Sequence, residues 1–198
     1  MSLLHDLGIK YHTDKAYDHN FMRFYEKFFE PIRFEVKNLL EIGVWGGASI
    51  KVWLEYFPNA QIYGVDTAPK PSVEQHERFT FITKNAFDTD VTSMFGTDFF
   101  DIVIDDGSHR MTEQRRSLKT YWPKIKPNGM FVMEDMHTSF WSEYVDVKPT
   151  TYEFLVDKLD TDDVELNTIR NQVKTFHLFH TPDHQRIRDS HITSILVK

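Results

Sequence analysis

Short apolar runs alternate with segments of helical spacing along most of the chain. This succession of strand, helix and strand is typical of a parallel sheet, in which each helix crosses from one strand to the next. The last two runs have only a polar loop between them, so we expect them to pair antiparallel. The pattern predicts an α/β fold, a Rossmann-like, doubly wound seven-stranded sheet that is mostly parallel with a C-terminal antiparallel strand. The runs predicted to be strands are residues 36–42, 61–65, 79–83, 99–105, 129–133, 173–179 and 191–197.

Prolines and turn residues separate the helical segments from the strands. Aromatic residues recur at helical spacing within residues 3–33, and we expect them to pack against the sheet. The chain shows no repeat, linker or low-complexity stretch, so we predict one domain over residues 1–198, with an N-terminal helical or flap segment at 1–35 and a Rossmann-like core at 36–198. The other predicted helices are residues 48–56, 88–95, 111–122 and 150–159, and residues 160–163 have the composition of a solvated turn.

Two of the apolar runs, at residues 99–105 and 129–133, end abruptly in acids followed by a histidine. Parallel neighbours lie about 4.8 Å apart, and ligands of open α/β sheets collect beyond the carboxyl ends of the strands. We therefore expect the two acidic tips to converge on one site. Their polar residues are Asp105, Asp106 and His109 after the first run, and Glu134, Asp135 and His137 after the second.

The first strand leads into a glycine-rich turn that begins a helix. Glu41 stands near the end of that strand, and Gly43 and Gly46 lie in the turn. Such a turn lets the backbone approach a nucleotide-like ligand, although any tight strand-to-helix turn favours glycine. Asp66 ends the second strand, where an acid can accept hydrogen bonds from both ribose hydroxyls of an adenosine. The alternative for Asp66 is a cap or turn residue.

Composition narrows the class of protein. The formal net charge of −7 argues against a general nucleic-acid binder and favours a small-molecule ligand. The chain contains no cysteine, which excludes disulfides, thiolate catalysis and zinc–thiolate sites. No run approaches the roughly 18 apolar residues of a membrane helix, and no signal-peptide pattern opens the sequence. We expect a cytoplasmic protein without a membrane partner, and the sequence leaves open whether it forms a homo-oligomer.

With Glu41, the glycine turn and Asp66, the predicted sheet resembles that of a class I S-adenosylmethionine-dependent methyltransferase. An acid beside the turn suits the positive charge and the amino group of a sulfonium cofactor, whereas a pyrophosphate site would avoid it. We expect Asp105 either to face the cofactor or to support the acid cluster, because successive strand residues point to opposite sides of the sheet. Residues 84–87 depart from the family pattern. The family has a Gly-Asp turn that contacts adenine at this point, and this chain does not.

Within that superfamily, the polar residues at the two acidic strand ends closely resemble those of the macrocin and mycinamicin sugar O-methyltransferase family. The segment at residues 10–15 also looks like that family's entry segment, and we expect its Thr13 and Lys15 to contact the cofactor as part of a flap, with a solvated loop as the alternative. The family implies Mg²⁺ held by three carboxylates, which map onto Asp106, Glu134 and Asp135. Magnesium prefers hard oxygen ligands, and without a cation such close acids would be costly. The alternative is that some of these acids cap helices or pair with arginines.

His109 is the expected general base, with Asp106 as its catalytic neighbour. A sugar or phenol hydroxyl is a poor nucleophile, so removal of its proton assists attack on the sulfonium methyl group. We therefore expect a Mg²⁺-dependent O-methyltransferase acting on a sugar or other vicinal-hydroxyl group of a natural product or glycan. The alternatives are a catechol-type acceptor, or a metal-binding hydroxylase or non-methylating binding protein on the same fold. The roles of His137 and of the loop at 181–189 stay open.

Overall fold

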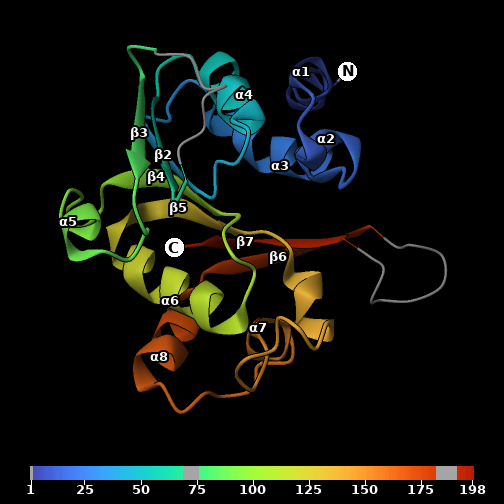
Figure 1. The fold of residues 1–198 in the computed structure, drawn as a ribbon, viewed down its shortest axis with the longest axis vertical. Helices are drawn as coiled ribbons and strands as arrows, with labels where there is room; N and C mark the ends of the chain where they lie inside the picture. Colours follow the sequence, from blue (N-terminus) through green and yellow to red (C-terminus); the bar gives the residue numbers. More distant parts are fainter. Residues whose placement is uncertain (1, 69–75, 182–190) are drawn as a thin grey trace.

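The computed structural model describes residues 2–68, 76–181 and 191–198, which build a seven-stranded sheet with helices on both faces (Figure 1). The strand order is β3-β2-β1-β4-β5-β7-β6, and β7 runs antiparallel to both of its neighbours. The predicted fold is confirmed, including the single antiparallel strand near the C-terminus. The strands are β1 (Asn38–Ile42), β2 (Gln61–Asp66), β3 (Phe79–Thr83), β4 (Phe100–Asp105), β5 (Ile125–Met133), β6 (Thr175–Thr181) and β7 (His191–Val197).

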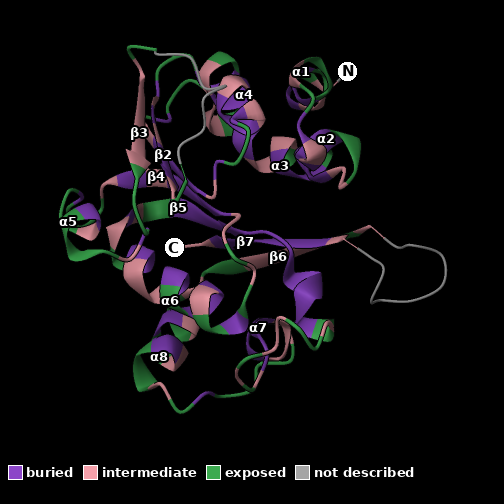
Figure 2. Ribbon diagram, viewed as in Figure 1, coloured by how far each residue is buried: buried purple, intermediate pink, exposed green. Residues whose placement is uncertain are grey.

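Side chains of the central strands point alternately to the two faces of the sheet and contribute to two hydrophobic cores. Leu39 and Ile102 belong to the core on one face, while Leu40 and Val103, one residue further along, belong to the core on the other. Helices α1, α3 and α4 complete the first core, and α5 to α8 complete the second. Figure 2 shows the result, a central sheet that is mostly buried, with exposed residues mainly on the outer helix faces and in loops and at a few strand positions, such as Pro127 and Asn128 of β5.

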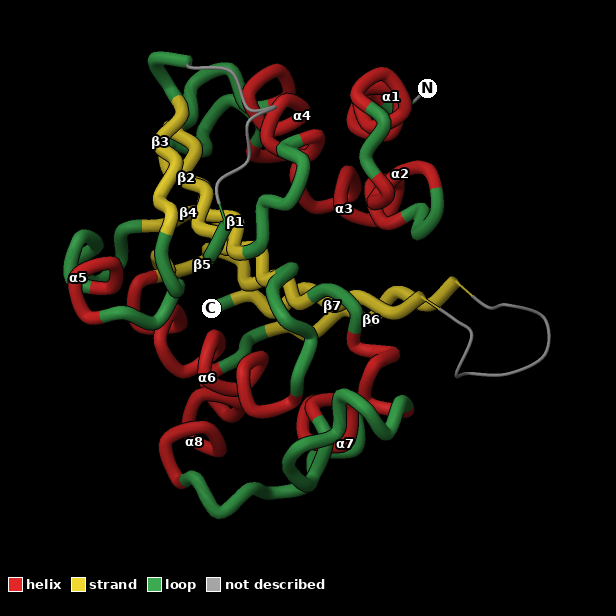
Figure 3. Tube along the Cα trace, viewed as in Figure 1, coloured by secondary structure: helices red, strands yellow, loops and turns green. Residues whose placement is uncertain are grey.

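The helices follow the predicted segments with some differences in extent (Figure 3). Residues 3–33 form three separate α-helices, whereas the aromatic spacing suggested one helical segment. The helix predicted at 150–159 ends after one turn and a half, and a further helix, α8, was missed. Asp163 is not a solvated turn residue, because it accepts hydrogen bonds from the N–H groups of Glu165 and Leu166 and so caps α8. The helices are α1 (Leu3–Tyr11), α2 (Asp14–Tyr17), α3 (Phe21–Phe29), α4 (Ala48–Tyr56), α5 (Thr89–Thr92), α6 (Met111–Tyr121), α7 (Thr151–Leu155) and α8 (Val164–Gln172).

The strand register aligns the carboxyl ends of the three central strands. Ile42 of β1 pairs with Asp105 of β4, and Asp105 in turn pairs with Met133 of β5. The residues that follow these positions therefore leave the sheet at one level, which is where the acids lie. The predicted loop at 181–189 lies almost wholly outside the described residues. Within the described part of the chain, no helix combines the length and the apolar composition that a membrane crossing would need.

Candidate functional site

The turn after β1 passes very close to the tip of β4. Gly43 adopts φ +85°, and a Cβ atom placed there would lie 2.0 Å from the carbonyl oxygen of Asp106. Glycine is therefore required at Gly43 for both conformation and space. A Cβ atom at Gly46 would meet nothing within 4 Å, so Gly46 is not required on steric grounds.

Asp66 braces this turn from the end of β2. Its Oδ2 accepts hydrogen bonds from the N–H groups of Val44 and Trp45, at 3.0 and 2.9 Å, and its Oδ1 accepts one from Ala68. These bonds match the turn role that the sequence left as the alternative. Asp66 also lines a cavity, so a role toward a ligand stays a prediction.

Two cavities meet at the turn. The first, of about 550 Å³, is lined by the turn, the tips of β2 and β4, and residues 84–87, the segment that departs from the family pattern. The second, of about 430 Å³, lies between the turn and α2 and is lined by Thr13 and Lys15. Gly43 and Asp106 border both cavities, while Gly46 borders the second.

Lys15 lies at the centre of a buried ionic cluster, which we call the lysine-centred group (Lys15, Glu41 and Glu134). Its Nζ contacts Glu134 Oε2 at 2.8 Å and Glu41 Oε1 at 3.5 Å, and it also donates to Asp106 Oδ2. The Lys15 side chain is only 2% exposed. Burial acts to lower the pKa of Lys15, but the surrounding carboxylates outweigh it and raise the pKa well above its ordinary value. Lys15 is therefore an internal cation rather than part of a solvated loop.

Both acids of this group are held by further donors. Glu41 Oε2 accepts hydrogen bonds from Ser49 Oγ at 2.8 Å and Trp53 Nε1 at 3.0 Å, and burial raises the pKa of Glu41 to about 7. Glu134 Oε1 accepts a hydrogen bond from the Tyr25 hydroxyl at 3.0 Å, and burial raises the pKa of Glu134 well above its ordinary range. Glu41 lines neither cavity, although the sequence suggested that it contacts the cofactor.

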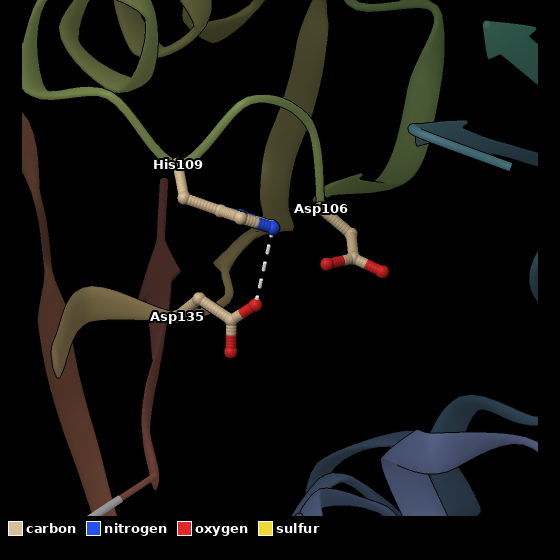
Figure 4. Close-up of side chains that lie close together, drawn as sticks. All are labelled: Asp106, His109 and Asp135. Atoms are coloured by element: carbon tan, nitrogen blue, oxygen red, sulfur yellow. Dashed lines mark ion pairs between the residues drawn. The ribbon is translucent and has the colours of Figure 1, made fainter. Parts of the chain in front are cut away.

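Asp106, His109 and Asp135 form a second cluster, the cavity-facing group, in which one ligand atom from each residue lies within 4.8 Å of the others. Figure 4 shows the three side chains converging, with His109 Nε2 at 3.3 Å from Asp135 Oδ2. All three residues line the first cavity. His109 and Asp135 both adopt positive φ, near +60° and +53°. Such strained backbone in non-glycine residues clusters at functional sites.

The cavity-facing group holds two carboxylates, and Lys15 pairs with one of them, Asp106. Burial raises the pKa of Asp135 to about 7, and the nearby charge of Asp106 adds to the effect. Burial lowers the pKa of His109, so its imidazole is neutral near pH 7. Asp135 Oδ1 is buried and has no hydrogen-bond partner among the described residues. Two carboxylates with an unsatisfied oxygen are a donor set that suits a divalent cation.

The three predicted metal ligands are thus divided between the two groups. Asp106 and Asp135 lie together, but both oxygens of Glu134 point toward Lys15 and Tyr25. Asp105 lines the first cavity, its Oδ1 accepts a hydrogen bond from the Gly107 N–H, and burial raises its pKa to about 7. The helical spacing of the aromatic residues predicts core packing for Tyr25, and the family resemblance places it after the entry segment, but neither predicts its hydrogen bond to Glu134.

Comparison with known proteins points to methyltransferases. Residues 40–136 match the model of a methyltransferase domain. It is 36% identical over 148 residues to mycinamicin VI 2''-O-methyltransferase from Micromonospora griseorubida, and 35% identical over 150 residues to demethylmacrocin O-methyltransferase from Streptomyces fradiae. Each match covers 70% of this chain and 37% of the relative, so the matched part is well under half of each relative's length.

A solved structure supports the same assignment. The MycE methyltransferase of the mycinamycin biosynthetic pathway, in complex with Mg, SAH and mycinamycin VI, superposes with a TM-score of 0.77 at 28% identity. The superposition covers 98% of this chain and 53% of that chain. The predicted resemblance to the macrocin and mycinamicin enzymes is therefore confirmed.

The matched methyltransferase domain does not hold the whole site. It contains Glu41, Asp106, Glu134 and Asp135, whereas Lys15 and Tyr25 precede it in the sequence. The N-terminal helices thus supply the cation and the hydroxyl that hold Glu134, and they form one wall of the second cavity. The methyltransferase domain and the N-terminal helices together build the acidic edge of the sheet.

Proposed function

We propose that the chain is a Mg²⁺-dependent O-methyltransferase that transfers the methyl group of S-adenosylmethionine to a hydroxyl of a sugar, or of another vicinal diol, on a small natural product. The observation that carries the proposal is the convergence of Asp106, His109 and Asp135 on the wall of the first cavity. Solved and curated relatives support it, since one is a complex with Mg and SAH and others are named as O-methyltransferases of sugar-bearing natural products.

The first cavity suits the cofactor. Its volume of about 550 Å³ lies in the range of pockets for small molecules and cofactors. Gly43 keeps the backbone open beside it, Asp66 stands at the β2 tip, and Asp105 and Asp106 supply negative charge for a sulfonium. We assign Gly43, Asp66 and Asp105, which line this cavity, to cofactor binding, while a cofactor contact of Gly46, which borders the second cavity, stays the prediction made from the sequence. Lys15 and Glu41 act on this site indirectly, because Lys15 pairs with Asp106 on the cavity wall and with the buried Glu41.

Asp106 and Asp135 would hold the magnesium ion, whose charge orients and acidifies an acceptor hydroxyl when it is bound. The neutral imidazole of His109 accepts the hydroxyl proton at Nε2 as the oxygen attacks the methyl carbon. Asp135 Oδ2 lies 3.3 Å from that nitrogen, where its negative charge would stabilise the imidazolium that results. Glu134 fixes the adjoining backbone through Lys15 and Tyr25, and its role as a third metal ligand remains the prediction made from the sequence.

Acceptor profiling with methyl-labelled S-adenosylmethionine and Mg²⁺ tests the proposal. We expect label to enter glycosides with adjacent free hydroxyls, with a mass gain of one methylene unit in the product. Transfer to catechols but not to glycosides would replace the sugar acceptor by a catechol-type one. Gain of oxygen, or no turnover of any diol, would overturn the methyltransferase assignment.

A further inference from the structure

Trp45 combines two features that the stability of the fold does not explain. It lies in the glycine-rich turn after β1, and it is 74% exposed and belongs to neither hydrophobic core. Its backbone adopts φ +41°, in the left-handed region that favours glycine and that bulky residues rarely enter. A glycine at this position would relieve the strain and would remove nothing from either core. The tryptophan side chain is therefore better explained by contact with a ligand.

Hydrogen bonds of the turn fix the place of Trp45. Its N–H donates to Asp66 Oδ2 at 2.9 Å, and the Gly47 N–H donates to the Val44 carbonyl at 2.8 Å. A Cβ atom at the next residue, Gly46, would meet nothing within 4 Å. The indole is thus carried by a turn of fixed geometry, with open space beside it.

Trp45 stands where the two cavities meet. Among the described residues, four border both cavities, namely Asp14, Gly43, Trp45 and Asp106. This junction therefore combines two carboxylates and an indole with a glycine that keeps the backbone open. Aromatic faces attract cations, tryptophan most strongly, and proteins use aromatic rings to recognise methylated onium groups such as quaternary ammonium. A methylated cation is the ligand chemistry that the junction suits.

The two carboxylates of the junction already have partners within the protein. Asp106 pairs with the ammonium of Lys15. Asp14 Oδ1 accepts hydrogen bonds from the Lys15 N–H at 2.8 Å and from the Thr13 hydroxyl at 3.3 Å. A ligand cation would have to share these acids with Lys15, which repels it. The face of the Trp45 indole offers attraction that does not compete with Lys15.

We propose that the face of Trp45 packs against the methylsulfonium of S-adenosylmethionine, so that the site prefers the cationic cofactor to the neutral thioether left after transfer. The inference rests on the proposed function, in which the first cavity holds the cofactor. When the methyl group passes to the acceptor oxygen, the electron pair of the broken S–C bond stays on sulfur, and the positive charge there is lost. The cation–π attraction is lost with it, and Trp45 thereby favours release of the thioether product.

The test is calorimetric titration of S-adenosylmethionine and of S-adenosylhomocysteine into the full chain at one pH. The wild type is compared with Trp45→Phe, Trp45→Leu and Trp45→Gly, which leave a smaller aromatic face, an aliphatic side chain and no side chain. Phe34→Leu is the matched control, because Phe34 is an aromatic residue that is 60% exposed and lines neither cavity. Urea unfolding of each variant measures its stability.

We expect Trp45→Leu and Trp45→Gly to weaken binding of S-adenosylmethionine by about 5- to 30-fold, the range of one cation–π contact, and Trp45→Phe to weaken it less. Binding of S-adenosylhomocysteine should change by less than about twofold, because the thioether carries no charge. Phe34→Leu should change neither affinity. Trp45→Gly should unfold at a urea concentration no lower than the wild type, since the backbone strain is relieved.

The outcomes separate this inference from the proposed function. Equal weakening of both ligands by Trp45→Leu, or an unchanged affinity for S-adenosylmethionine, would overturn the inference and leave the methyltransferase assignment in place. A clear loss of stability in Trp45→Gly would show that Trp45 serves the fold and would overturn the inference as well. Failure of the wild type to bind either ligand would overturn the proposed function itself.

Discussion

The lysine-centred group and the cavity-facing group lie side by side at the same edge of the sheet, yet their charges are balanced in different ways. Glu41 and Glu134 are buried around the ammonium of Lys15 and have further hydrogen-bond donors. Asp135 has a buried oxygen without a donor among the described residues and faces a cavity. The acids of the lysine-centred group have their partners within the protein, whereas the cavity-facing group is arranged to receive a ligand.

Adjacent residues of the chain belong to opposite groups. Glu134 still follows the strand, and its N–H donates to the carbonyl of Asp105. Asp135 adopts φ +53°, which turns the chain, so its side chain points to the cavity-facing group while Glu134 points to Lys15. A pair of neighbouring acids in a sequence thus need not act on one ion.

The largest expected effect is on the rate, from loss of the cavity-facing imidazole. His109→Ala should lower turnover by about 10²- to 10⁴-fold, because the acceptor hydroxyl loses its base, while the affinity for S-adenosylmethionine is kept. Steady-state kinetics with labelled cofactor measures the first quantity, and calorimetry measures the second. The control is His180→Ala on β6. A rate within a few-fold of the wild type would remove His109 from the base role.

The second effect is on stability and concerns the lysine-centred group. Lys15→Met should lower the free energy of unfolding by about 3–5 kcal/mol, because it leaves buried carboxylates without their cation. Lys10 offers a matched control, since it pairs with Glu55 at 2.7 Å on the surface, with both side chains largely exposed. Lys10→Met should change the stability little. Urea denaturation of both variants makes the comparison, and equal losses would contradict the role of Lys15 as an internal cation.

The third effect separates the two neighbouring acids. Asp135→Asn should weaken Mg²⁺ binding by at least about tenfold, whereas Glu134→Gln should weaken it less, since Glu134 acts through Lys15 and Tyr25. Calorimetric titration with Mg²⁺ at constant pH measures both. Equal weakening would return Glu134 to the ligand set that the sequence suggested.

The last effect is a pH dependence of stability. The pKa of Glu41 is raised to about 7 in the folded state, above its unfolded value near 4.5, so the folded state binds this proton more tightly. Its contribution to stability is therefore present at low pH and falls as the pH rises from about 4.5 to 7. Glu41→Gln does not titrate, so it should gain on the order of 2 kcal/mol relative to the wild type between pH 5 and 8. Denaturant unfolding of the wild type and Glu41→Gln at both pH values measures this gain. If the difference in unfolding free energy between the two proteins is the same at both pH values, the raised pKa of Glu41 is contradicted.

Much of the fold followed from the sequence because strand and helix periodicity is local. The strand ends, the glycine turn and the acidic tips were all visible as short patterns, and register then placed Asp106 beside Asp135. The position of Lys15 was not visible, because tertiary packing of the N-terminal helices carries it to acids 91 and 119 residues away. Glu134 and Asp135 point in different directions because of one backbone angle, the positive φ of Asp135, and the amino-acid composition does not predict that angle. Helix α8 was missed because its polar residues give only weak periodicity. The single-domain limits and the cytoplasmic location stay predictions.

Calorimetric titration of S-adenosylmethionine into the protein tests the central claim most directly, first with Mg²⁺ and then with a chelator. We expect micromolar binding in both conditions, since the cavity walls at Gly43, Asp66 and Asp105 do not depend on the ion. Absence of binding in both conditions would contradict the methyltransferase account and leave the cavity-facing acids to another ligand.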